Sequence, residues 1–119
     1  MRIGELSKIT GVSIPTIRLY EKEGLIGPAS RTQGRLREFS PEQEIRLNFI
    51  KRVRNLGFSL DDVKALLDLS GNAEENKRRN ILQSIRSGIK TRRDDLARLE
   101  RFVDADGQSV GPLAIWNER

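Results

Sequence analysis

The 119-residue sequence contains no cysteine and no histidine, and only six of its side chains are aromatic. Without thiols and imidazoles these residues cannot form disulfides, zinc fingers or iron–sulfur clusters, and cannot support thiol or histidine catalysis. No apolar run approaches the roughly 18 residues of a membrane-spanning helix, and the charged start MRIGELSKITG does not resemble a signal peptide. We therefore expect a small cytoplasmic protein that neither crosses nor binds a membrane.

Other signs of catalysis or metal binding are also missing. There is no phosphate-binding loop pattern, and the pairs Asp61-Asp62 and Asp94-Asp95 are better explained as helix-start and surface charges. Asp104 and Asp106 could attract a hard cation, but two carboxylates in a loop are usually just solvated. We predict no catalytic residue, no metal site and no cofactor.

The positive charge is unevenly distributed. The net charge is +5, and residues 1–60 carry all of this excess while residues 61–119 are neutral. Sixteen of the 22 basic residues are arginine, which suits bidentate contacts to phosphate and guanine. A basic half joined to a neutral half suggests a nucleic-acid-binding module with an extension, although an ordinary solvated basic surface would look similar.

Two short helices are predicted at the start of the chain. Ile3, Leu6 and Ile9 form an apolar stripe over residues 3–10, which Gly11 ends. Ser13 is a good N-cap for a second helix over 14–23. Two helices joined by a tight turn that contains glycine are typical of a helix-turn-helix, and a generic helical hairpin is the alternative.

Residues 25–39 predict a short β-hairpin, which we call the wing. RLREF, residues 35–39, alternates charged and apolar side chains as a strand does. Arg31, Arg35 and Arg37 would lie near its tip and edge. A solvated basic loop is the alternative, and we favour the wing because it directly follows the candidate recognition helix.

Two further helices follow the wing. The first begins at Ser40, with Gln43 placed to close a capping box, and ends near Gly57. We expect its apolar side to contain Ile45, Leu47, Phe49, Ile50 and Val53. Its last turns carry Lys51, Arg52 and Arg54, which suit the helix dipole or a phosphate. Ser59 caps the second, whose apolar side contains Leu60, Val63, Leu66 and Leu67.

Residues 74–104 have the heptad spacing of a coiled coil. The positions spaced alternately by 3 and 4 are Leu82, Ile85, Ile89, Arg92, Leu96, Leu99 and Val103, and we call this set the seam. A helix of this length extends for roughly 45 Å, too far for the preceding domain to cover, so a second copy is the simplest cover. The alternative is a helix folded back on its own domain. Arg92 in the seam needs a partner or an exit to solvent.

These predictions divide the chain into a DNA-binding domain at 1–71, a dimerisation helix at 74–104 and a tail at 105–119. In the tail we expect Trp116 to pack on a neighbouring surface without binding a ligand.

Three strings resemble the MerR family of bacterial transcriptional regulators. They are IGELSKITGVSIPTIRLYEKEGLI at 3–26, RLREFS at 35–40 and FIKRVRNLGFSLDDVKALLDL at 49–69. The resemblance implies a mainly α fold in which two winged helix-turn-helix heads are joined by an antiparallel coiled coil. It also implies a homodimer that distorts a near-palindromic promoter operator in double-stranded DNA for RNA polymerase.

The resemblance and the residue pattern together indicate the DNA contacts. Thr16, Arg18 and Lys22 are available to the groove, while Ile14 and Ile17 face the core. Tyr20 resembles the backbone-contacting tyrosine of the family and Arg37 its wing arginine. The full expected set is Thr16, Arg18, Tyr20, Lys22, Arg31, Arg35 and Arg37.

The sequence also departs from the family. Leu36 stands where many relatives have an aromatic, and Phe39 replaces a frequent tyrosine, so one hydroxyl is lost. The cysteines of metal- and redox-sensing relatives are missing, which excludes thiolate metal sensing by these residues. Two other functions remain open: an architectural, excisionase-like protein that bends DNA, and a coiled-coil protein-interaction module.

Overall fold

The computed structural model describes residues 1–31, 36–69 and 74–105. The chain separates into two compact units, Met1–Asn72 and Ala73–Arg119, and we call the first of them the head. Each unit is described by itself. The elements of the head are α1 (Ile3–Thr10), α2 (Ile14–Lys22), β1 (Ser30–Arg31), β2 (Arg37–Glu38), α3 (Pro41–Asn55) and α4 (Leu60–Asp68). The second unit contains α5 (Glu75–Asp104).

The turn between α1 and α2 depends on one glycine and one serine. Gly11 adopts a left-handed conformation, φ +74°, and its N–H bonds to the Ser7 carbonyl at 2.8 Å. A residue with a Cβ would be strained there, so the glycine ends α1. Ser13 then caps α2 by accepting a hydrogen bond from the Thr16 N–H at 3.3 Å. The predicted helix-turn-helix is confirmed.

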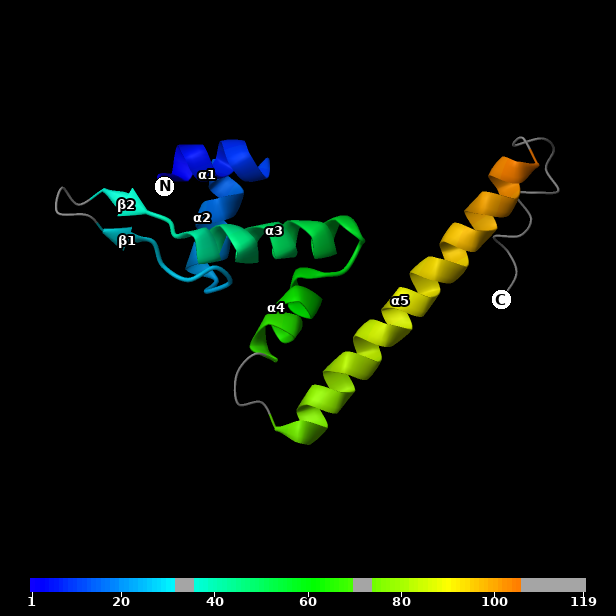
Figure 1. The fold of residues 1–119 in the computed structure, drawn as a ribbon. Helices are drawn as coiled ribbons and strands as arrows, with labels where there is room; N and C mark the ends of the chain where they lie inside the picture. Colours follow the sequence, from blue (N-terminus) through cyan, green and yellow to red (C-terminus); the bar gives the residue numbers. More distant parts are fainter. Residues whose placement is uncertain (32–35, 70–73, 106–119) are drawn as a thin grey trace. The chain divides into compact units, whose positions relative to one another are not determined.

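The wing is a two-stranded antiparallel sheet. Ser30 pairs with Glu38 and Arg31 pairs with Arg37, and the two strands lead away from the helices (Figure 1). Each regular strand is only two residues long, shorter than the alternating pattern predicted. Leu25, Ile26 and Phe39 on either side of the sheet are buried, so apolar contacts fix its base to the helices.

Capping boxes begin α3 and α4. At α3 the Ser40 side chain accepts from the Gln43 N–H, and the Gln43 side chain accepts from the Ser40 N–H at 2.8 Å. Ser59 and Asp62 make the same exchange at α4. Each box satisfies two backbone donors that a helix start leaves free, so both starts predicted from sequence are confirmed.

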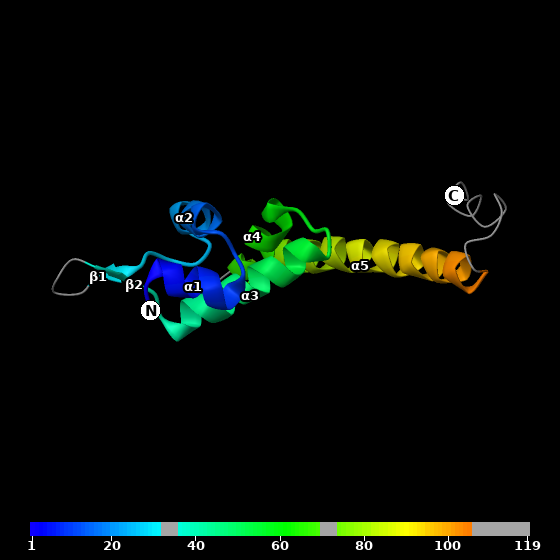
Figure 2. The ribbon, with the colours of Figure 1, turned by 90° about the horizontal axis from the view of Figure 1, so that it is seen from above.

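The core of the head lies where the helices meet. Helix α1 packs against α2 and α3, and α3 also packs against α4 (Figures 1 and 2). Every element of the head except β1 and β2 contributes a fully buried apolar side chain. These side chains are Leu6, Ile17, Leu47, Ile50 and Val63.

Three apolar residues predicted for the core are exposed instead. Ile9 is 54% exposed, Ile45 67% and Phe49 40%. The apolar positions of α3 extend around more than one side of the helix, and the side that includes Leu47 and Ile50 packs against the rest of the head. Ile45 and Phe49 remain on another side.

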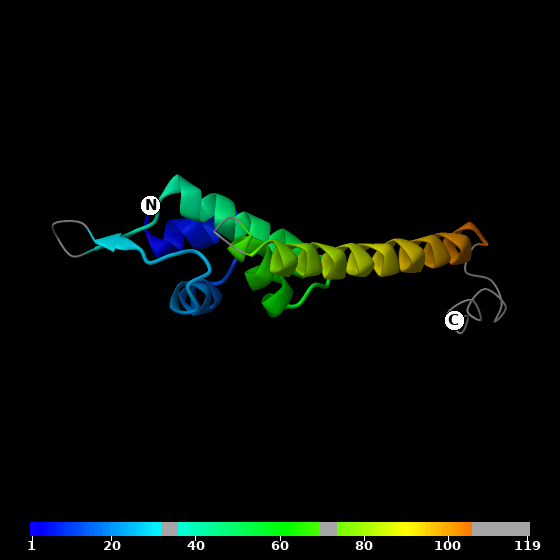
Figure 3. The same cartoon turned by 90° about the horizontal axis from the view of Figure 1, so that it is seen from below.

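Helix α5 is a single helix of 30 residues, drawn without a break in Figure 3. The predicted long helix is thus confirmed, and none of its residues is buried. Leu96 is 64% exposed and Val103 is 60% exposed. Within the described residues no helix is long and apolar enough to cross a membrane.

Candidate nucleic-acid interface

Helix α2 presents two cations away from the core. Ile17 is fully buried and anchors the helix, whereas Arg18 and Lys22 are exposed. They are four residues apart and therefore share one side of the helix. Thr16 is half-buried, and its hydroxyl oxygen accepts from the Ser13 hydroxyl at 2.8 Å. Tyr20 is half-buried against the core, between the two faces as expected.

Two arginines lie opposite each other on the two strands of the wing. Arg31 is exposed and lies in register with Arg37. Like charges directly opposite one another destabilise a strand pair, but Arg37 also forms an ion pair with Glu21 of α2. Arg35, the third wing residue predicted to contact DNA, lies outside the described residues.

Side chains of α3 form hydrogen bonds with the base of the wing. The Gln43 Nε2 donates to the Gly27 carbonyl at 3.1 Å and to the Pro28 carbonyl at 3.0 Å. The Arg46 Nε donates to the Leu25 carbonyl at 2.9 Å. These bonds satisfy carbonyls of the irregular segment between α2 and β1, so the chain enters the wing along a defined path.

Two of the three cations at the end of α3 bind within the head. The Lys51 Nζ donates to the Thr10 carbonyl at 2.6 Å and caps α1, and the Arg54 Nη1 donates to the Phe58 carbonyl at 2.9 Å. Arg52 is exposed. The sequence alone left a helix-dipole role and a phosphate contact open for all three.

The side chains that connect these elements were not predicted from the sequence. Glu21 and Arg46 were not singled out, Gln43 was predicted only as a capping residue, and Lys51 was assigned no partner within the head. The partners that were not predicted lie between 8 and 41 residues away in the chain. Only Gln43 had a sequence signal, its capping-box position, and that signal does not reveal its two bonds to the wing.

An ion pair links α2 to α4. The Lys64 Nζ lies 2.9 Å from the Glu23 Oε2. The hydrogen bond and the positive charge of Lys64 lower the pKa of Glu23 below its usual value. The hydrogen bond that Lys64 donates to Glu23 raises the pKa of Lys64. Both side chains are at the surface, so the pair is screened by solvent and orients α4 rather than stabilising it strongly.

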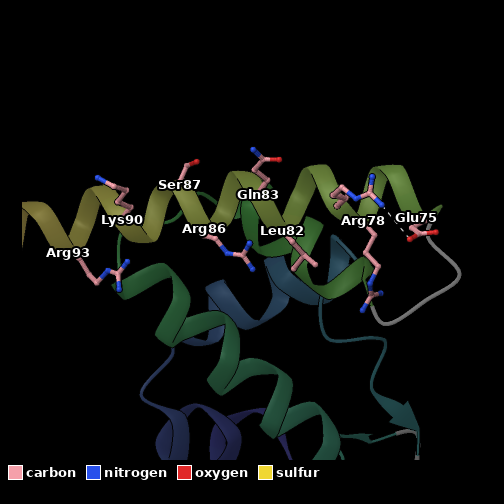
Figure 4. A pocket seen from close by; sticks show the side chains of 9 residues that line it. Glu75, Arg78, Leu82, Gln83, Arg86, Ser87, Lys90 and Arg93 are labelled. Carbon is pink, nitrogen blue, oxygen red and sulfur yellow. Dashed lines mark ion pairs between the residues drawn. The ribbon is translucent and has the colours of Figure 1, made fainter.

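The seam of α5 forms an uncovered apolar line with one arginine in it. Leu82, Ile89 and Leu99 are 39%, 44% and 44% exposed. Arg92 is half-buried, and its Nη1 donates to the Gly88 carbonyl at 2.9 Å, so its charge lies back along its own helix. Figure 4 shows Leu82 on the helix surface among polar and cationic side chains such as Arg78 and Arg86.

Within the described ranges, no group of three or more His, Cys, Asp or Glu side chains could hold a metal ion. Trp116 and Asp106 lie outside the described residues.

Comparisons with known proteins agree with this geometry. The family profile described as "MerR HTH family regulatory protein" matches residues 1–70, and the profile "MerR, DNA binding" matches residues 45–105. The HTH-type transcriptional regulator ZntR homolog of Haemophilus influenzae is 42% identical over 102 residues, covering 83% of this chain and 75% of that protein. The mercuric resistance operon regulatory protein of Shigella flexneri is 30% identical over 103 residues, covering 87% and 72%.

Solved structures give the same result. A MerR family transcriptional regulator from Listeria monocytogenes superposes with a TM-score of 0.68 at 30% identity, covering 95% of this chain and 90% of that one. The regulator PbrR691 from Ralstonia metallidurans, in complex with lead(II), gives a TM-score of 0.61 at 31% identity, covering 88% and 84%. The chain therefore belongs to the MerR helix-turn-helix family of DNA-binding regulatory proteins.

Proposed function

We propose that the protein is a transcriptional regulator that binds a near-palindromic operator in promoter DNA as a homodimer, and that it has no catalytic activity. The observation that carries the proposal is the arrangement of the head. Arg18 and Lys22 are exposed on α2, the second helix of the helix-turn-helix, and the wing next to it exposes Arg31. In winged helix-turn-helix proteins these are the elements that enter the groove and contact the backbone.

Each proposed contact has a physical role. Thr16 and Arg18 lie near the start of α2, where a recognition helix reads base edges, and Arg18 can donate to guanine or phosphate. Lys22 supplies a point charge for a phosphate. Tyr20 and the wing arginines position the head on the backbone, which is read without regard to sequence. The proposed set is Thr16, Arg18, Tyr20, Lys22, Arg31, Arg35 and Arg37.

The homodimer is proposed from α5. A helix with an exposed apolar seam is stabilised when a second apolar surface covers that seam. Residues 77–93 carry seven cations and no carboxylate, whereas residues 94–104 carry four carboxylates and two cations. An antiparallel pair places the cationic stretch of one copy along the acidic stretch of the other, while a parallel pair places cations beside cations. The charge pattern thus favours the antiparallel coiled coil.

A dimer with two identical heads matches DNA with two-fold symmetry, so the operator is an inverted repeat. We propose that the dimer bends and untwists this operator so that RNA polymerase can use the promoter, and that it acts in the cytoplasm. One solved structure that this chain resembles, an EcmrR–DNA complex in EcmrR-RPo, has 25% identity and a TM-score of 0.53, over 90% of this chain and 40% of that one.

The proposal can be tested by selecting genomic duplexes with the purified protein at near-physiological salt and sequencing those retained. We expect an inverted repeat to be enriched. Arg18→Ala should weaken binding to that repeat by about tenfold or more and leave the dimer intact, since a base contact contributes about 1–3 kcal/mol. Arg79→Ala, which removes the same charge from α5, is the matched control and should bind like the original protein.

Three results would contradict the proposal. Retention of DNA without an enriched motif would indicate an architectural DNA-bending protein instead. If no DNA is retained and a partner protein is captured both with and without nuclease treatment, the chain would be an interaction module. If the Arg18→Ala and Arg79→Ala variants bind the enriched repeat with equal affinity, α2 is not the element that recognises the DNA sequence.

A further inference from the structure

Glu21 is the point at which the wing is attached to α2. Its Oε2 accepts a hydrogen bond from the Ala29 N–H at 2.7 Å, immediately before β1. Its Oε1 forms the ion pair with Arg37 of β2. One carboxylate therefore contacts the chain beside each strand of the wing, from the helix that carries Arg18 and Lys22.

The surroundings of Glu21 differ from those of a surface carboxylate. Its side chain is 12% exposed, whereas that of Glu23, two residues further along at the C-cap of α2, is 39% exposed. A carboxylate removed from water loses solvation, and only well-formed hydrogen bonds and an opposite charge offset that loss. Ala29 and Arg37 supply both, so the two contacts depend on each other.

Arg37 keeps donors for a second partner. A guanidinium has five N–H donors in a fixed plane, and the carboxylate of Glu21 engages only one side of that plane. The Arg37 side chain is 39% exposed. Glu21 also places a negative charge between α2 and a strand pair in which Arg31 and Arg37 are opposite each other, which lowers the repulsion across the wing.

We propose that Glu21 is a positioning residue for DNA recognition. It fixes the wing on α2 and holds Arg37 in the orientation in which the remaining N–H groups meet a phosphate, so that α2 and the wing reach the DNA as one preorganised surface. Preorganisation lowers the entropy lost when the complex forms. The proposal rests on the DNA-binding function inferred above and assigns a role to a residue that makes no DNA contact itself.

The first test needs no DNA. Amide hydrogen exchange measured on the free full-length protein reports the bond to the Ala29 N–H directly. In Glu21→Ala we expect the Ala29 amide and the β1–β2 amides to exchange at least about tenfold faster. In Glu21→Gln, whose amide oxygen can still accept, Ala29 should remain protected. Glu23→Ala, with the same charge change at the C-cap of the same helix, is the matched control and should exchange like the original protein.

The second test uses the duplex enriched by selection from genomic DNA. Glu21→Ala and Arg37→Ala should each lose about tenfold in affinity. Each should also reduce the slope of log K against log salt by about 0.9 for every phosphate that the variant no longer neutralises. The double variant should bind no more weakly than Arg37→Ala, because Glu21 acts through Arg37. A general loss of stability would change neither the slope nor this coupling.

Two outcomes would overturn the proposal. Protection of Ala29 in Glu21→Ala equal to that in Glu23→Ala would overturn the proposed attachment. Additive losses of affinity in the double variant would show that Glu21 does not act through Arg37. If far-UV circular dichroism shows that Glu21→Ala is unfolded, Glu21→Gln takes its place in the DNA test, where it should lose part of the affinity and of the slope. If no duplex is enriched at all, the proposed function fails, while the exchange experiment still decides whether Glu21 holds the wing.

Discussion

Single charged side chains in the head have two kinds of task. Glu21, Lys51 and Arg54 are bound to groups of the head itself, and each satisfies a backbone N–H or carbonyl that a helix or turn leaves free. Arg18 and Arg31 are exposed on the surface proposed to meet DNA. A hydrogen bond made by a charged side chain contributes about 1.5–3 kcal/mol to the stability of the fold. Side chains that make such bonds within the head are therefore poor candidates for contacts with DNA, which would require those bonds to break.

The ion pair between Glu23 and Lys64 predicts a pH dependence. Because Lys64 holds the pKa of Glu23 below its usual value of 4.5, the pair stabilises the head above that pH, and the contribution is lost as the pH falls through the lowered pKa. Because Glu23 raises the pKa of Lys64 above its usual value of 10.5, the contribution is also lost as the pH rises through the raised pKa. An NMR titration should show the pKa of Glu23 returning toward 4.5 in Lys64→Ala and unchanged in Lys8→Ala.

Burial rather than residue type determines how much stability is lost when a side chain of α3 is shortened. Leu47 is fully buried and Ile45 is 67% exposed. Leu47→Ala should lower the free energy of unfolding by about 2–5 kcal/mol, since it removes buried methyl groups and leaves a cavity. Ile45→Ala should change it by less than about 0.5 kcal/mol. Chemical denaturation followed by circular dichroism measures both, and equal effects would show that the assigned core side of α3 is wrong.

At the scale of elements, α5 differs from the helices of the head. The helices α1 to α4 each bury at least one side chain, whereas α5 buries none over 30 residues. Ion pairs along its surface, such as Lys90 with Asp94 at 3.0 Å, support the helix only weakly. Packing of an apolar face supplies most of the stability of a helix in a protein, so we attribute the stability of α5 to pairing with a second copy.

The seam predicts which substitutions separate the dimer. Leu96→Asp places an unpaired carboxylate in the proposed interface and should raise the dissociation constant by about a hundredfold or more. Ala97→Asp adds the same charge at the next residue, which is exposed and outside the seam. Sedimentation analysis should show monomers for Leu96→Asp and dimers for Ala97→Asp. A dimer that survives Leu96→Asp would show that the seam is not the interface.

Element boundaries could be predicted from sequence because local chemistry sets them. Ser13, Ser40 and Ser59 cap helices within three residues of themselves, and Gly11 ends α1 through its own backbone angle. The exposed cations of α2 followed from the period of the helix. These features depend on neighbours in the chain, and a pattern of residue types is enough to find them.

The attachments between elements could not be predicted in this way. The bond from Lys51 to Thr10 spans 41 residues, and that from Gln43 to Gly27 spans 16. Such pairs depend on the path of the chain through the wing and on which side of α3 faces inward. The same uncertainty made Ile45 and Phe49 look like core residues, because a helical period alone does not choose between two apolar sides.

At the scale of the whole molecule, the basic first half of the sequence and the heptad pattern of the second half have different functions. The head carries the winged helix-turn-helix, and its residues 1–60 account for the net charge of +5, while α5 carries the seam. A regulator needs both: a single head binds phosphates with little specificity, whereas two heads joined symmetrically read two half-sites together. The proposed dimer is therefore part of the specificity and not only of the stability.

The most direct measurement is transcription in vitro from a promoter that carries the enriched inverted repeat, with purified bacterial RNA polymerase holoenzyme. We expect the protein to change the amount of transcript, Arg79→Ala to do the same, and Arg18→Ala and Leu96→Asp to have little effect. A transcript level that stays unchanged while the protein occupies the repeat would contradict the claim that this chain regulates transcription.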